Sequence, residues 1–316
     1  MEAFMETRIL GNTGLEVSRL GIGLAAIGEE ETFDTIKTVE VVLKTALDQG
    51  ITFFDTAECY FYSEEMVGHA ISDRRSEFLL ATKCGHPAGL QESGEYDIDW
   101  SIEGILLTLD RSLKRLKTDY VDLLQLHSCS VEVLEQGEVI AALTKARDAG
   151  KTRFIGYSGD NEAAQWAVDS GHFDTLQTSF SLADQRPRNG LLQSAKQNGL
   201  GVIAKRPIAN TAWGSPASPT ARLKFDPNYG DEYWKRTQAM AALGPLDIPF
   251  GDRILMSLGF VMAHEEIDTA IVGTRNPEHL KSNIDLFNSK LPIDKSIVTE
   301  LYRRWDELDE NWIGQI

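Results

Sequence analysis

Polar residues of three chemical types follow apolar runs that are typical of buried β-strands. The run Phe53-Phe54 ends at the carboxylate of Asp55, and the phenol of Tyr60 follows five residues later. Two similar runs end in Lys83 and His127. An ammonium group close to a phenol favours the phenolate and makes the phenol a better acid, while a carboxylate keeps the ammonium charged and oriented. These four residue types could therefore move a proton to or from an oxygen atom held by the phenol and the imidazole.

Proton transfer of this kind is the acid–base half of carbonyl reduction. The other half is a hydride, which no side chain supplies, so the set implies a nicotinamide cofactor. Each residue alone also has a structural explanation: Asp55 could cap a helix, Lys83 could be a solvated strand end, His127 could be a core histidine and Tyr60 could be a packing residue. Their joint occurrence favours catalysis.

A helix-to-strand alternation could bring these residues together. The pattern Ala-x-x-x-Gly recurs along the chain, with copies that end at Gly50, Gly150, Gly171 and Gly199, and each of these copies precedes a short apolar run. Helical periodicity is evident in Ser101–Leu116 and Leu134–Ala149. Eight runs have the continuous apolar character of strands buried on both faces. They are RLGIGL, ITFFD, FLLATK, VDLLQLH, TRFIGYS, DTLQTSF, GVIAK and DTAIVGT. We expect a closed (β/α)8 barrel of the TIM type; a doubly wound sheet is the alternative.

The carboxyl ends of the strands of such a barrel meet at one rim, which is where active sites of this architecture lie. Adjacent strands are about 4.8 Å apart, so side chains on neighbouring strand ends can share a pocket. The polar residues at these positions are Asp55, Lys83, His127, Ser158, Gln177, Lys205 and Thr274.

Several segments lie outside the repeated pattern. Arg8–Ser18 contains Gly11, Asn12 and Gly14 between short apolar pieces, which predicts an N-terminal β-hairpin. Ile208–Gly251 holds five of the ten prolines, and we interpret it as a long rim insertion before the last βα unit, with a helix near Tyr233–Leu243. A C-terminal helix completes the barrel. We expect one domain over residues 1–316, with specificity coming from His86–Trp100 and from the insertion around Trp213 and Trp234.

The composition excludes several classes of partner. The 316 residues carry a net charge of −17, which argues against nucleic acid or an anionic membrane as a partner. There is no signal-peptide pattern, no stretch of membrane-spanning length and no CxxC spacing among the three cysteines. We therefore expect a cytoplasmic protein without a metal site that acts on a small molecule. The sequence does not indicate its oligomeric state.

With these residues identified, the chain resembles the aldo-keto reductases over nearly its whole length. The segment FDTAECYFYSEEMVGHAI is close to that family's DTA-x-x-Y-x-x-SE-x-x-x-G pattern, and further matches follow in the same order. These are LLATK, DLLQLH, IGYS, LQTSFS and IVGTRNPEHLKSN. The resemblance implies a catalytic tetrad of Asp55, Tyr60, Lys83 and His127, with Tyr60 as proton donor, Lys83 and Asp55 adjusting its acidity and His127 orienting the carbonyl.

The resemblance also implies NADP(H) bound across the barrel mouth without a Rossmann fold, with NAD(H) as the alternative. By position, Ser158 and Gln177 would hold the carboxamide, and Gly23 and Leu24 would lie beside the nicotinamide. The other residues implied to bind the cofactor are Asp55, Lys205, Arg206, Gly273, Thr274, Arg275, His279 and Asn283.

Three positions depart from the family's pattern. Gly159 replaces a frequent asparagine, Lys205 a frequent aromatic residue, and His279 a frequent arginine or glutamine near the 2′-phosphate. Lys205 could disfavour the oxidised cofactor or reach a pyrophosphate, and Arg275 could compensate for His279 because a guanidinium binds phosphate well.

Three functions remain open at this point. The tetrad favours an NADPH-dependent carbonyl reductase. A Schiff-base lyase or aldolase would use Lys83 as nucleophile, but Asp55 would keep that amine protonated. A catalytically weak NADP(H)-binding sensor or regulatory module is the remaining alternative.

Overall fold

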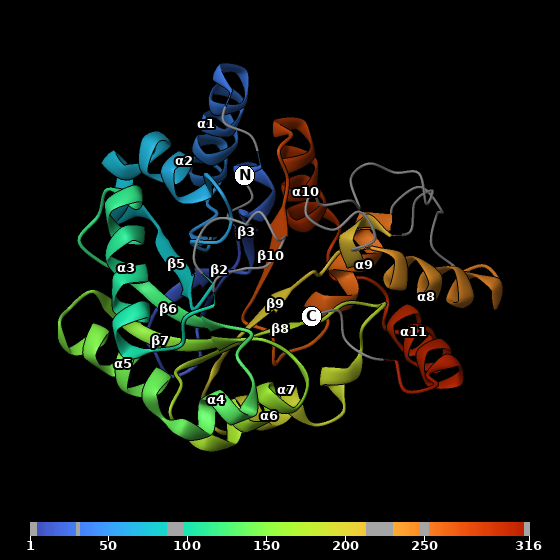
Figure 1. The fold of residues 1–316 in the computed structure, drawn as a ribbon. Helices are drawn as coiled ribbons and strands as arrows, with labels where there is room; N and C mark the ends of the chain where they lie inside the picture. The colour runs from blue at the N-terminus through green and yellow to red at the C-terminus, as the bar shows by residue number, and fades with distance from the viewer. Residues whose placement is uncertain (1–4, 30–31, 87–97, 213–229, 247–252, 313–316) are drawn as a thin grey trace.

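Eight parallel strands form a closed barrel at the centre of the molecule (Figure 1). The computed structural model describes residues 5–29, 32–86, 98–212, 230–246 and 253–312. The barrel strands are β3 (Leu20–Gly23), β4 (Phe53–Asp55), β5 (Leu79–Cys84), β6 (Val121–His127), β7 (Thr152–Ser158), β8 (Thr175–Ser179), β9 (Gly201–Lys205) and β10 (Thr269–Gly273). Pairing of β10 with β3 closes the barrel, with Gly273 opposite Gly23. All eight predicted runs are strands, and the predicted (β/α)8 architecture is confirmed.

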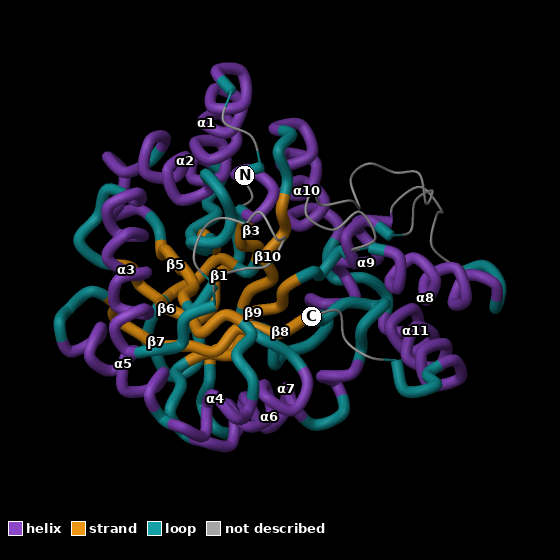
Figure 2. Tube along the Cα trace, viewed as in Figure 1, coloured by secondary structure: helices purple, strands orange, loops and turns teal. Residues whose placement is uncertain are grey.

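Helices surround the barrel on its outer side (Figure 2). They are α1 (Phe33–Asp48), α2 (Ser63–Ala70), α3 (Ile102–Leu116), α4 (Val131–Gln136), α5 (Glu138–Asp148), α6 (Asn161–Ser170), α7 (Leu191–Gln197), α8 (Asp231–Ala242), α9 (Arg253–Met262), α10 (Pro277–Lys290) and α11 (Lys295–Leu308). Helix α3 illustrates the local signals. Ser101 caps its first turn by accepting the N–H of Gly104, and the buried residues Ile105, Leu109 and Leu116 recur at helical spacing on one face. The predicted C-terminal helix corresponds to α11.

The prediction of one helix over Leu134–Ala149 is wrong. The structure has two helices there, α4 and α5, which meet at Gly137. Gly137 has φ 77°, a left-handed conformation that ends α4 and that glycine adopts without steric cost. Both helices bury apolar residues, including Leu134 and Leu143, so the apolar spacing continues across the break and hides it.

The predicted N-terminal hairpin is confirmed and closes the bottom of the barrel. Strands β1 (Thr7–Ile9) and β2 (Glu16–Ser18) pair in antiparallel fashion. Three hairpin residues pack against inward-facing residues of the barrel strands in one apolar cluster. Its buried members are Leu10, Leu15, Val17, Phe53, Ala81, Leu123, Ile203 and Ile271. This end of the barrel is therefore filled, and the opposite end is left for a site.

The predicted insertion Ile208–Gly251 is described only in part. Helix α8 lies where a helix is predicted, whereas Trp213 falls outside the described residues, as do residues 87–97 of the predicted His86–Trp100 specificity loop. Tyr233 is buried, and its hydroxyl donates to Oδ2 of Asp184 at 3.2 Å. Trp234 packs against the main core. Both described aromatic residues of α8 therefore support the structure of the rim.

Candidate active site

The alternation of side chains along the strands places the predicted catalytic residues inside the barrel. Phe53 and Leu123 point into the apolar cluster at the bottom of the barrel. Two positions later, Asp55 and Gln125 point to the same side, one layer nearer the rim. Lys83 is paired in register with Gln125 on the neighbouring strand and lies in the same layer. A polar layer is thus stacked directly on an apolar one.

Asp55 and Lys83 form a buried ion pair in this layer. Nζ of Lys83 donates to Oδ2 of Asp55 at 2.6 Å and to the backbone carbonyl of Thr56 at 2.8 Å. The amides of Gln125 and Gln177 donate to Oδ1 of Asp55 at 3.2 and 2.8 Å. Both oxygens of the carboxylate are therefore satisfied, as a buried charge requires. Because Lys83 is 1% exposed and donates to two acceptors, the geometry disfavours its use as a nucleophile.

Tyr60 lies above this ion pair on the loop after β4. Nζ of Lys83 is 4.7 Å from the centroid of the Tyr60 ring. The ring meets that of His127 edge-on, with centroids 5.8 Å apart and an angle of 83° between planes. The four residues of the predicted tetrad are therefore brought together at the carboxyl ends of β4, β5 and β6.

His127 is held as a neutral imidazole. Burial lowers its pKa well below the ordinary 6.5, and the positive charges of Lys83 and other nearby groups lower it further. His86 stacks on His127, with ring centroids 5.0 Å apart and 29° between planes. Burial also lowers the pKa of His86. An uncharged imidazole can interact with a carbonyl oxygen only by donating an N–H group.

A cavity of about 500 Å³ opens over these residues. It is lined by three predicted catalytic residues, Asp55, Tyr60 and His127, while Lys83 lies beneath it. Seven further residues of the predicted cofactor set line the same cavity: Gly23, Leu24, Ser158, Gln177, Lys205, Arg206 and Gly273. Its size is within the usual range of small-molecule sites.

Four residues of the predicted cofactor set do not line this cavity. Thr274, Arg275, His279 and Asn283 lie on the loop after β10 and on α10, next to Gly273. Arg275 pairs with Glu29 through Nη1 at 2.9 Å. His279 is exposed, whereas Asn283 is buried.

The positive charge of Lys205 is paired with the carboxylate of Asp160. Asp160 is not among the polar strand-end residues predicted from the sequence. Nζ of Lys205 lies 3.1 Å from Oδ2 of Asp160, and Arg206 donates to Oγ of Ser179 at 2.8 Å. Burial alone would raise the pKa of Asp160, but Lys205 and Arg206 reverse this and lower it. Burial lowers the pKa of Lys205. The one sequence signal for Asp160 is its position two residues after Ser158, the last residue of β7.

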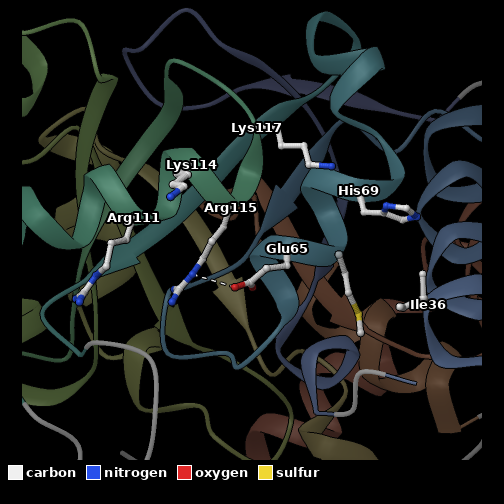
Figure 3. A pocket seen from close by; sticks show the side chains of 8 residues that line it. Ile36, Glu65, His69, Arg111, Lys114, Arg115 and Lys117 are labelled. Carbon is white, nitrogen blue, oxygen red and sulfur yellow. Dashed lines mark ion pairs between the residues drawn. The ribbon is translucent and has the colours of Figure 1, made fainter. Parts of the chain in front are cut away.

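An outer groove between α2 and α3 is lined by the ion pair of Arg115 with Glu65, which follows Tyr60 by five residues (Figure 3). Arg111 lies 2.8 Å from buried Glu58, which precedes Tyr60 by two residues. Arg115, on the same helix, pairs with Glu65 at 2.9 Å and lies 3.6 Å from Glu64. Arg111 and Arg115 of α3 thus hold the segment around Tyr60 in place through its acidic residues.

Sequence reasoning misses one other residue of the site, Gln125, and the contact that His86 makes with His127. Gln125 lies within an apolar strand and is easily taken as part of it, although its position two residues before His127 places it on the inner face. His86 has the sequence context of a loop start. Its stacking on His127 depends on the path of the chain after β5 and has no signal in the spacing.

Within the described residues, no helix is long and apolar enough to cross a membrane, and no group of three or more His, Cys, Asp and Glu side chains could hold a metal ion.

A closed (β/α)8 barrel with a buried carboxylate–ammonium pair, a phenol and a neutral imidazole at its mouth defines a class of barrel oxidoreductases. The chain belongs to the aldo/keto reductase family, whose model matches residues 19–303. The uncharacterized oxidoreductase YqkF of Bacillus subtilis is 30% identical, with 93% of this chain and 94% of the relative covered. L-galactose dehydrogenase of Arabidopsis thaliana is 31% identical over 89% of this chain and 87% of the relative. The holo form of an aldo-keto reductase from Bacillus halodurans has a TM-score of 0.76 at 25% identity, covering 95% of this chain and 96% of its own.

Proposed function

We propose that the protein reversibly reduces an aldehyde or ketone to an alcohol with NADPH, and that Tyr60 is the general acid and base. The observation that supports this most directly is the sequence of contacts from Asp55 through Lys83 to the ring of Tyr60 at the floor of the cavity. Tyr60 combines a donor hydrogen with a position next to a buried cation, which is what a general acid of this kind requires.

In the direction of reduction, Tyr60 gives its hydroxyl proton to the carbonyl oxygen. Two of the three N–H groups of the Lys83 ammonium are used by Asp55 and Thr56. The third is left to stabilise the phenolate that forms on Tyr60. Neutral His127 donates an N–H to the same carbonyl oxygen and fixes its orientation. When bound, the nicotinamide supplies the hydride that reaches the carbonyl carbon.

The lining of the cavity fits a nicotinamide cofactor. Gly23 and Gly273 face each other on β3 and β10, so this part of the wall has no side chains and a flat ring could approach the backbone. Ser158 and Gln177 supply hydroxyl and amide groups that could bind a carboxamide. Lys205 and Arg206 are cations of the lining that could meet a pyrophosphate.

Two further features bear on the cofactor and the compartment. A relative from Schizosaccharomyces pombe, 28% identical, is named as an NADP(+) aldo-keto reductase, which supports NADPH as the first choice. The three cysteines are free and buried, which suits a reducing compartment such as the cytoplasm.

The proposal is tested by following the absorbance of NADPH and NADH against aldehydes, ketones and sugars, with the wild type and Tyr60→Phe. We expect turnover by the wild type and a loss of about 10²–10⁴-fold in the variant, the usual effect of removing a general acid. Near wild-type turnover in Tyr60→Phe would exclude the mechanism. Tight NADPH binding without turnover on any substrate would instead identify a regulatory module.

A further inference from the structure

The imidazole of His127 has a further contact, a hydrogen bond that the proposed chemistry does not yet use. Its Nδ1 lies 3.3 Å from Sγ of Cys59, the residue directly before Tyr60. Cys59 is buried, with 6% of its surface exposed, and it lines the same cavity. One short loop therefore carries both the phenol of Tyr60 and a thiol that touches the ring of His127.

The direction of this hydrogen bond follows from the protonation of its two partners. Burial raises the pKa of the Cys59 thiol to about 12, so the sulfur carries its hydrogen at neutral pH. His127 is neutral, as its lowered pKa requires, and so has one ring nitrogen with a hydrogen and one with a lone pair. Sulfur is a weak acceptor, whereas an unprotonated imidazole nitrogen is a good one. The thiol therefore donates and Nδ1 accepts.

We propose that Cys59 is a positioning residue that holds His127 in the tautomer with hydrogen on Nε2, so that the N–H of this ring is available to a carbonyl oxygen in the cavity. This inference rests on the proposed reductase function. In the opposite tautomer, Nδ1–H would face the sulfur and the lone pair of Nε2 would meet the lone pairs of the carbonyl oxygen. That arrangement repels the substrate at the atom that must be polarised.

The ring neighbours of His127 do not set the tautomer. His86 stacks on the ring face and Tyr60 meets the ring edge-on. Neither contact is a hydrogen bond to Nδ1. Among the described residues, Cys59 is the hydrogen-bond partner of that nitrogen.

The test uses three cysteine variants of the protein, one histidine variant for assignment, and two measurements. Cys59→Ala removes the donor, Cys59→Ser keeps a hydroxyl donor of similar size, and Cys129→Ala removes another buried thiol that has no part in the site. The first measurement is the ¹H–¹⁵N spectrum of the histidine rings, with His127 assigned by its loss in His127→Gln. The second is kcat and KM for carbonyl reduction.

We expect the wild type and Cys59→Ser to show hydrogen on Nε2 of His127, and Cys59→Ala to show a mixture of tautomers. We expect kcat/KM to fall about fivefold in Cys59→Ala, as for one lost hydrogen bond, and to stay within about twofold of the wild type in Cys59→Ser and Cys129→Ala. Hydrogen on Nδ1 in the wild type would overturn the inference, as would an unchanged tautomer and rate in Cys59→Ala.

The spectrum needs no substrate, so it decides the tautomer even if no carbonyl compound is reduced. Failure of the proposed function would appear as absent turnover in every protein, including the wild type. Failure of the inference would appear as a Cys59→Ala spectrum identical to that of the wild type. If Cys59→Ala does not fold, Cys59→Val, which also lacks a donor but fills the space of the thiol, is measured in its place, and a spectrum identical to that of the wild type would overturn the inference.

Discussion

The ammonium group of Lys83 donates to the carboxylate of Asp55 at 2.6 Å in a place where both side chains are almost inaccessible to solvent. Removing two charges from water is costly, and the cost is recovered only when both are well paired and hydrogen-bonded. Here the carboxylate accepts two amide hydrogen bonds in addition to the ammonium. The protein therefore maintains a positive charge beneath Tyr60 without exposing it to the cavity.

Breaking this pair should cost stability and activity, and the two costs can be separated. Lys83→Met and Asp55→Asn each leave one buried group without its partner, so we expect each to lower the free energy of unfolding by about 3–5 kcal/mol. The double variant removes both charges and should be more stable than either single variant, while remaining inactive. Denaturant unfolding and NADPH oxidation measure the two effects. A double variant no more stable than Lys83→Met would contradict this account.

The fold was predictable because its signals are local. Each barrel strand is a short apolar run, such as the one ending at Asp55, and helices end at glycines of the repeated pattern. The proximity of the candidate site residues was predictable for a related reason: a parallel barrel brings all its strand ends to one rim. The positions of Asp55, Lys83 and His127 in sequence therefore fixed their proximity in space.

What the sequence did not reveal is one local break in a helix and several contacts between distant segments. The break at Gly137 was hidden because apolar spacing continues on both sides of it. The stacking of His86 on His127 depends on the path of a loop, and the pairing of Arg275 with Glu29 joins residues 246 positions apart. Such contacts follow from the closed barrel and cannot be inferred from spacing along one segment.

The rate of carbonyl reduction should not follow the titration of an ordinary histidine. The pKa of His127 lies well below 6.5, so its ring is neutral above that value and stays neutral for some distance below it. We expect kcat/KM to show no inflection near pH 6.5 when it is measured between about pH 5.5 and 8. A fall in kcat/KM on passing below pH 6.5, absent in His127→Gln, would mean that the imidazole gains its proton there and that solvent reaches the ring.

The contact between Glu29 and Arg275 should influence the choice of cofactor. The side chain of Glu29 is 6% exposed, and its carboxylate forms an ion pair with the guanidinium of Arg275. The family resemblance assigns that guanidinium to the adenosine end of the cofactor. Removing the carboxylate charge in Glu29→Gln leaves Arg275 available to a 2′-phosphate. We expect NADPH to bind about two- to fivefold more tightly, the range of a partly exposed ion pair, with little change for NADH. Fluorescence titration with both cofactors measures this, and equal changes for the two would exclude a role in discrimination.

Gly28 should be intolerant of a side chain because it touches the loop that carries Tyr60. A Cβ atom there would lie 2.1 Å from the carbonyl oxygen of Tyr60 and 2.5 Å from the amide nitrogen of Ser63. We expect Gly28→Ala to lower the free energy of unfolding by about 1–3 kcal/mol, as overpacking does, and to lower kcat by displacing the phenol. Gly23→Ala is the control for stability, since the nearest neighbour of its Cβ among the described residues would lie 3.8 Å away. Equal melting temperatures for the two variants would contradict the prediction.

Glu64 should make the protein less stable as the pH rises. Burial raises the pKa of this carboxyl from 4.5 to about 7, although Thr82 donates to its Oε1 at 2.7 Å. Between these two values the unfolded chain releases the proton while the folded chain keeps it, so the free energy of unfolding falls with increasing pH. The loss amounts to about 3 kcal/mol once the pH exceeds 7.

Glu64→Gln keeps an acceptor for Thr82 without a titrating group, so its stability relative to the wild type should grow over this interval. Unfolding of both proteins in urea at a series of pH values measures the difference; a constant difference would show that Glu64 ionises as easily in the folded protein as in the unfolded chain.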